Sequence, residues 1–226
     1  MRYLAIGDIH GCMTALSTLA DYVPFTSTDM LVTLGDYVDR GTHSRAVMDW
    51  VVARMELGLL TPLRGNHEIM MCDARTSPQH FIAWVSYGGD ATLKSYGSKI
   101  HKDALKVVPE RHWQFMERDC QSHFETNTHI FVHAGVHPKK QLDQQPDTML
   151  YWEKFNNPAP HRSGKIVVCG HTPQRNERPL NIGHTICIDT GATYGGWLTC
   201  LDAASGKYWQ ANEQGGTRSG LLETKK

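Results

Sequence analysis

The chain has 226 residues and carries 23 Lys and Arg against 23 Asp and Glu, so its formal net charge is zero. This balance provides no general field that would attract nucleic acid or an anionic membrane, and we expect neither as a partner. The length fits one domain or at most two small ones. We expect a single domain over residues 1–214, followed by a mobile polar tail over residues 215–226.

The cysteines and the N-terminal residues indicate the cellular compartment. Six scattered cysteines form no C-x-x-C pair, and no apolar run approaches the length of a membrane span. The chain enters a strand-like segment directly after Met1, without the basic and apolar regions of a secretory signal. We therefore expect reduced thiols and a cytoplasmic protein.

The first 65 residues alternate between short apolar runs and stretches with helical periodicity. Pro24 ends the first helical stretch, Ser44 is a plausible N-cap of the second, and Gly58 stops it. This β-α-β-α-β order predicts a parallel sheet with crossover helices. The expected strands cover residues 3–6, 30–34 and 59–63.

The rest of the chain predicts a second sheet and further helices. Residues 69–120 have a helical pattern that Gly88-Gly89 interrupts, and we expect them to pack over one side of the sheet. Residues 130–132 and 166–169 are predicted buried strands, and residues 185–211 have the short strands and Gly-rich turns of an antiparallel meander. The predicted fold is α/β (α+β), with two mixed sheets packed together and helices outside.

Each predicted strand leads into a turn that combines glycine with a side chain able to bind a metal. Asp, Asn and His without Cys suit Mn, Fe or Zn. Six such groups are too many for one catalytic ion with an open position, and they indicate a two-metal site that clamps a phosphate. The turns are Gly7-Asp8-Ile9-His10-Gly11, Gly35-Asp36 with Asp39-Arg40-Gly41, Gly65-Asn66-His67-Glu68, His133-Ala134-Gly135 and Gly170-His171-Thr172.

These five motifs, in this order, resemble those of the calcineurin-like metallophosphoesterases, and among them the compact phosphoprotein phosphatases of bacteria and phages. The resemblance implies a β-sandwich flanked by helices and two divalent or trivalent metal ions, Mn²⁺ first, with Fe or Zn as alternatives. It implies that one metal is held by Asp8 and His10 and that Asp36 bridges both. The second metal would be completed by Asn66, His133 and His171.

The resemblance also implies roles around the phosphate. A metal-bound hydroxide would attack phosphorus directly, while His67 acts as general acid and Arg40 grips the phosphate. Asp39 would orient His67, and we expect this carboxylate to raise the pKa of His67. Glu68 is expected to cap a helix or support the site, because Met71 breaks the H-E-x-x-H pattern of zinc proteases.

One departure from the family pattern concerns the second phosphate-binding arginine, which is absent from residues 150–155. Arg162, Arg175 or Lys154 can substitute, and the sequence does not choose among them. Tyr194 is expected either to overhang the active site or simply to pack. Trp84 is expected to pack in the core or a lid.

The predicted function is a metal-dependent phosphatase of phosphoserine and phosphothreonine in proteins, with a phosphoprotein or phosphopeptide as substrate. A symmetrical diadenosine-tetraphosphate hydrolase is the alternative, since such enzymes carry the same motifs. A non-catalytic scaffold ranks lower, because it predicts lost metal ligands and all six are present. The sequence leaves open the physiological substrate, the metal and the oligomeric state.

Overall fold

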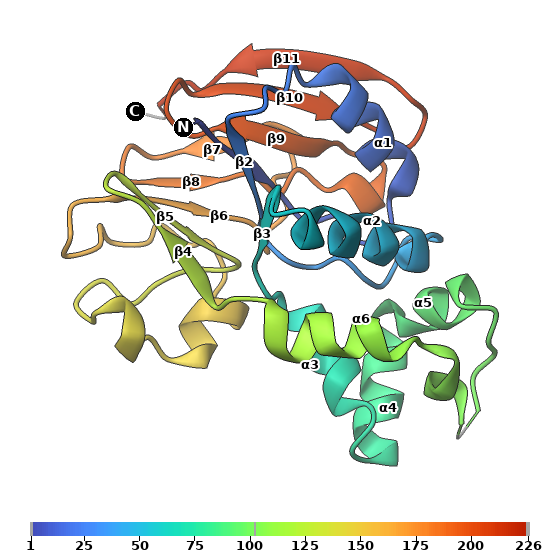
Figure 1. Cartoon of the computed structure of the whole chain (residues 1–226). Coiled ribbons are helices and arrows are strands. Elements are labelled where there is room, and N and C mark those ends of the chain that lie inside the picture. The colour runs from blue at the N-terminus through green and yellow to red at the C-terminus, as the bar shows by residue number, and fades with distance from the viewer. Residues whose placement is uncertain (1, 102, 225–226) are drawn as a thin grey trace.

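The computed structural model describes residues 2–101 and 103–224. Two mixed β-sheets pack face to face with helices outside them, as the sequence predicts (Figure 1). The larger sheet has the strand order β11 (Thr217–Leu221), β10 (Lys207–Ala211), β9 (Leu198–Asp202), β1 (Arg2–Ile6), β2 (Asp29–Thr33) and β3 (Leu60–Pro62). The smaller sheet has the order β4 (His123–Glu125), β5 (His129–Val132), β6 (Ile166–Cys169), β8 (Thr185–Cys187) and β7 (Leu180–Asn181).

The predicted parallel start of the chain is confirmed. Strand β1 pairs in parallel with β2, and β2 with β3, while helices α1 (Met13–Tyr22) and α2 (Ser44–Glu56) form the crossovers. Gly58 follows α2 with φ +72°, the left-handed conformation that ends many helices. Ser44 is not the N-cap, because it is the first residue of α2 and its buried hydroxyl accepts a hydrogen bond from the backbone of Asp39.

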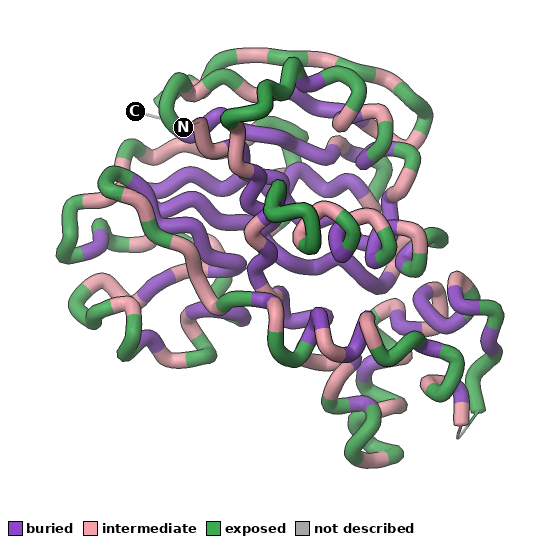
Figure 2. The backbone as a smooth tube through the Cα atoms, viewed as in Figure 1, coloured by how far each residue is buried: buried purple, intermediate pink, exposed green. Residues whose placement is uncertain are grey.

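One hydrophobic core lies between the two sheets, where apolar side chains of both inner faces meet. Figure 2 shows buried residues running along the strands that face each other. Alternation along each strand directs one set of side chains into this layer. The layer includes Ala5, Val32, Leu63, Phe131, Val168, Ile186 and Leu201.

The middle of the chain packs differently from the prediction. Helices α3 (Asn66–Asp73), α4 (Pro78–Trp84), α5 (Asp90–Ser95) and α6 (Glu110–Gln114) lie below the sheets in Figure 1, not over one sheet face. Helices α5 and α6 contact α2 instead. The apolar side chains of this segment join one cluster with those of α1, α2 and the outer face of the larger sheet, and this cluster buries the apolar side of its helices.

Two predictions about the C-terminal third need correction. The segment from residue 185 is not one meander, because β8 pairs in parallel with β6 in the smaller sheet, while β9, β10 and β11 form the antiparallel ladder of the larger one. A tail from residue 215 is wrong over Thr217–Leu221, which form β11. None of the residues of this edge strand is buried, so its sequence is polar and lacks the apolar pattern by which a strand is recognised. Residues 225–226 of the predicted tail lie outside the described residues.

Among the described residues, none of the helices is both long enough and apolar enough to span a bilayer.

Candidate metal centre and active site

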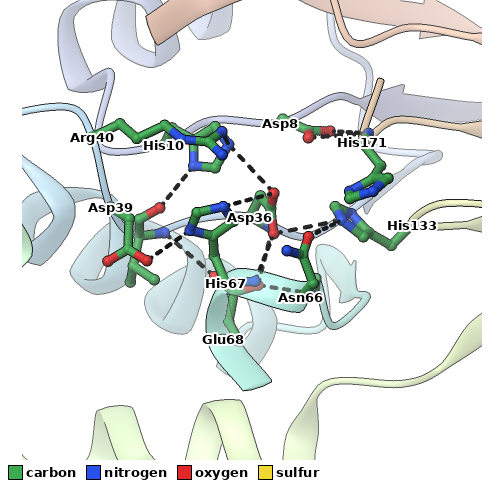
Figure 3. Close-up of polar contacts among 12 residues, drawn as sticks. Asp8, His10, Asp36, Asp39, Arg40, Asn66, His67, Glu68, His133 and His171 are labelled. Carbon is green, nitrogen blue, oxygen red and sulfur yellow. Dashed lines mark hydrogen bonds and ion pairs between the residues drawn. The ribbon is translucent and has the colours of Figure 1, made fainter. Parts of the chain in front are cut away.

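The polar turns that follow the strands converge on one buried site between the sheets and α3 (Figure 3). Parallel strands present their carboxyl ends at the same edge, which explains why distant motifs meet. All the predicted metal-binding side chains are brought here and each is less than a tenth exposed: Asp8, His10, Asp36, Asn66, His133 and His171.

Asp36 lies at the middle of this site. Its Oδ2 is 3.3 Å from Nε2 of His10, and its Oδ1 is 3.5 Å from Nε2 of His133. Two groups of side chains therefore have ligand atoms close enough to hold an ion, and Asp36 belongs to both. The groups are His10, Asp36 and His67, and Asp36, His133 and His171.

The histidine rings are oriented for metal binding. Nδ1 of His10 lies 2.8 Å from the carbonyl oxygen of Val38, and Nδ1 of His133 lies 2.8 Å from that of Leu34. Since a carbonyl only accepts, each Nδ1 carries the proton and each Nε2 keeps its lone pair. Burial lowers the pKa of both rings well below the ordinary value, so they stay neutral, as ligands must be.

The donor set fits a cation. Nε2 of His133 lies 3.0 Å from Oδ1 of Asn66, so two acceptors point at the same space. Burial is the main reason that the pKa values of Asp8 and Asp36 rise well above the usual range for a carboxyl, which means that a negative charge here lacks compensation. A positive ion between these groups would satisfy both conditions.

Asp8 is held in place by the turn that carries His171. Both of its carboxylate oxygens accept hydrogen bonds from the backbone N–H of His171, at 3.1 and 3.0 Å. It belongs to neither of the two groups of side chains that could hold an ion in the described part of the chain. Its pairing with His10 on one metal stays a prediction.

His67 and Asp39 form the predicted pair, with Nδ1 of His67 2.7 Å from Oδ2 of Asp39. The predicted direction of the pKa shift is wrong. Burial lowers the pKa of His67 to about 3 and raises that of Asp39 to about 8. In the protein alone, removal from water therefore outweighs the attraction between the two side chains, and it favours the uncharged pair.

The backbone of the site is strained. Of the seven described non-glycine residues with positive φ, five are predicted site residues, with φ between 46° and 75°. Such conformations cost about 1–3 kcal/mol each and persist only where neighbouring contacts hold them. The five are His10, Asp36, Asp39, Arg40 and His171.

Glu68 supplies one of those contacts. Its carboxylate, fully buried, accepts hydrogen bonds from four backbone N–H groups, two at each oxygen. The bond from the N–H of Gly65, the N-cap residue of α3, caps the start of this helix, which confirms the predicted capping role. Gly65 is required beside it, since a Cβ there would lie 2.2 Å from Oδ1 of Asp36. The other three donors are Asp36, Tyr37 and Val38.

Of the candidates for substrate binding, Tyr194 lies beside the site, whereas Arg162 and Arg175 make no polar contact with its described residues. Tyr194 is 64% exposed and its ring lies 5.5 Å from the guanidinium carbon of Arg40, so it overhangs the site. Arg162 donates to the carbonyl oxygen of Lys139 at 3.5 Å. Within the described part of the chain, no hydrogen bond or ion pair joins Arg162 or the exposed Arg175 to the residues of Figure 3, and their roles stay predictions.

Lys154 has better support as the second cation of the site. The carbonyl oxygen of Trp152 lies 3.3 Å from Nε2 of His171, and the N–H of Phe155 donates to Oγ1 of Thr172 at 2.9 Å. The segment that carries Lys154 is therefore fastened to the His171 turn on both sides. After burial, the charge of Lys154 is the next contribution that lowers the pKa of His171, to about 4.

Sequence reasoning missed Asp189. This carboxylate is buried, accepts the N–H of Gly191 at 3.0 Å, and is the neighbouring charge that most raises the pKa of Asp8. Burial raises the pKa of Asp189 to about 6. Its signal was the same as that of the other motifs, an apolar run followed by Asp and Gly at a strand end.

Comparison with known proteins agrees with this geometry. Residues 1–197 match the model of the calcineurin-like phosphoesterase family. The chain is 33% identical over 202 residues to serine/threonine-protein phosphatase 1 of Salmonella typhimurium, covering 86% of this chain and 88% of the relative. It is 26% identical to the asymmetrical bis(5'-nucleosyl)-tetraphosphatase PrpE of Anoxybacillus flavithermus, covering 89% and 90% of the two chains.

Solved structures share the fold. A putative diadenosine tetraphosphatase aligns with a TM-score of 0.66 at 21% identity, covering 97% of this chain and 93% of that one. A cold-active protein tyrosine phosphatase aligns with a TM-score of 0.64 at 18% identity, covering 96% and 78%.

The fold is that of a phosphoesterase, and Asp36 belongs to both groups of side chains that could hold a metal ion. The chain belongs to the calcineurin-like phosphoesterase family and is a hydrolase of phosphate esters.

Replacing Glu68 by Gln tests how far the site depends on this acid. A carboxamide offers one acceptor oxygen, so two of the four N–H groups lose their partner, and each unsatisfied buried donor costs about 1–3 kcal/mol. We expect the free energy of unfolding in denaturant to fall by about 2–6 kcal/mol. In the control Glu117→Gln, which breaks an exposed ion pair with Arg75, we expect a loss below about 1 kcal/mol. Equal losses in the two variants would contradict this role of Glu68.

Proposed function

We propose that this chain is a metal-dependent phosphatase that hydrolyses phosphoserine and phosphothreonine in proteins. The observation that carries the proposal is the position of Asp36 between two groups of neutral histidines, with the His67–Asp39 pair and Arg40 beside it. The similarity to a serine/threonine phosphatase at 33% identity supports this substrate class.

The side chains divide the work of binding two ions. His10 and Asp36, with Asp8 nearby, would hold one ion, while Asn66, His133 and His171 would complete the other with Asp36. When bound, such a pair lowers the pKa of a coordinated water from about 15.7 towards about 7 and neutralises charge on the phosphoryl oxygens.

Arg40 and Lys154 would hold the phosphate from the protein side. Nη1 of Arg40 lies 2.5 Å from Nε2 of His10, the atom that faces Asp36. Since an ion at His10 occupies that lone pair, Arg40 would turn from His10 towards the phosphate, which its planar guanidinium can meet with two hydrogen bonds. Lys154 would add a point charge where the family has a second arginine.

His67 would deliver a proton to the departing oxygen. Its Nδ1 is held by Asp39, which leaves Nε2 free to face the reaction site, 4.0 Å from Oδ2 of Asp36. The dianionic phosphate would favour the protonated ring that burial alone disfavours. This step matters most for serine and threonine, whose alkoxides leave poorly without a proton.

Hydrolysis of dinucleoside tetraphosphates is the second candidate. Trp152 and Tyr194 are exposed at the rim, 43% and 64%, and flat aromatic side chains can stack on nucleobases. The relatives that support this candidate are named as asymmetrical enzymes, so ATP and AMP would be the products, not the two ADP of the symmetrical reaction that the sequence predicts.

Metal dependence and His67 test the chemistry. We expect hydrolysis of a phosphoserine peptide to require added Mn²⁺ or a comparable ion, and His67→Asn to lower kcat by about 10²–10⁴, the usual contribution of a general acid. The exposed His80 provides the control His80→Asn, which should retain wild-type kcat. Hydrolysis that depends neither on metal nor on His67 would refute the mechanism.

The substrate class is tested by comparing kcat/KM for a phosphoserine peptide and diadenosine tetraphosphate under the same metal conditions. We expect the peptide to be preferred, because Arg40 and Lys154 suit a single phosphate group. A strong preference for the dinucleotide would overturn the protein-phosphatase proposal, and its products, ATP with AMP or ADP alone, would then identify the cleavage site.

A further inference from the structure

The carboxylate of Asp39 is held by more donors than His67 alone. It is 0% exposed, and the indole Nε1 of Trp84 lies 3.0 Å from its Oδ1 and 2.9 Å from its Oδ2. The hydroxyl of Thr92 donates to Oδ1 at 2.8 Å. With Nδ1 of His67 at Oδ2, three side chains fix both the position and the rotation of this carboxylate.

Thr92 also holds the backbone of the same residue. Its Oγ1 accepts the N–H of Asp39 at 2.8 Å, and the hydroxyl of Ser44 lies 3.0 Å away. One buried hydroxyl therefore bonds to the main chain and the side chain of Asp39, whose φ of 75° needs external support.

The break in the helical segment brings these donors together. Trp84 ends α4 and Thr92 lies in α5, and the segment Val85–Gly89 between them is kinked at Gly88, whose φ is 109°. The carbonyl oxygen of Gly88 accepts the N–H of Arg40 at 3.1 Å. A Cβ at Gly88 would lie 2.8 Å from that nitrogen, so the close approach requires glycine.

We propose that Trp84 and Thr92 are positioning residues for proton delivery: they hold Asp39 so that His67 points Nε2 at the leaving-group oxygen. This inference rests on the proposed phosphomonoesterase function. It assigns Trp84 a polar role in addition to its expected packing role, since the residue is fully buried and the only polar atom of its side chain faces Asp39.

The proposal makes a specific kinetic prediction. Thr92→Val keeps the shape of the side chain but removes the hydroxyl, so Asp39 loses a donor and can rotate away from His67. Proton delivery then fails, which matters for phenyl phosphate, whose leaving group is weakly acidic, and much less for p-nitrophenyl phosphate, whose anion leaves readily. Thr92 is fully buried behind Asp39 and has no assigned contact with the substrate, so KM should change little for either ester.

The test uses the Mn²⁺-loaded full chain with both esters. We expect Thr92→Val to lower kcat on the order of tenfold more for phenyl phosphate than for p-nitrophenyl phosphate, part of the 10²–10⁴ that a general acid contributes. Thr92→Ser, which retains the hydroxyl, should keep the wild-type ratio. Trp84→Phe, which retains an aromatic ring but loses the N–H, should shift the ratio in the same direction as Thr92→Val.

Equal losses of kcat on both esters in Thr92→Val and Trp84→Phe would overturn the proposal and leave these residues a purely structural role. The same conclusion would follow if Thr92→Ser matched Thr92→Val. Failure of the proposed function gives a different result, since the wild-type protein would then hydrolyse neither ester. Because the readout is a ratio within one protein sample, partial loss of folded protein cancels.

Discussion

The site depends on one buried carboxylate. Glu68 accepts the backbone N–H groups of Asp36, Tyr37 and Val38 from one loop and that of Gly65 from another. The first loop carries Asp36, the proposed shared metal ligand, and Arg40, the proposed phosphate-binding residue, and the second begins the helix with Asn66 and His67. A single acid thus fixes the two halves of the site against each other, and it holds the strained backbone around Asp36.

The sequence predicted the members of this site because their arrangement follows from topology. Parallel strands bring their carboxyl ends to one edge of a sheet, so Asp8 and Asp36, which follow β1 and β2, lie at the same edge. His171 follows β6 in the other sheet, and the packing of the two sheets brings it to Asp8. The donors to Asp39 could not be predicted in this way. Trp84 and Thr92 lie 45 and 53 positions further along the chain, on either side of a kink at Gly88 that directs both side chains to Asp39.

Burial accounts for the other differences between sequence and structure. The pKa of His67 falls to about 3 because the ring is removed from water, and depth of burial cannot be read from neighbouring residues. Conversely, β11 looks like a tail because an edge strand with exposed faces needs few apolar residues. The side chains around Asp36 suit any phosphate ester and do not distinguish a phosphoprotein from a dinucleotide. We propose that this distinction is made at the rim of the site, where Lys154, Trp152 and Tyr194 lie.

The central claim is that Asp36 is shared by two metal ions, and counting bound ions tests it most directly. Elemental analysis of Mn²⁺-loaded protein after gel filtration should give about two ions per chain for the wild type. Asp36→Asn should retain at most one, while Asp49→Asn, a change at an exposed carboxylate, should retain both. A single ion in the wild type, or two ions in Asp36→Asn, would contradict the account.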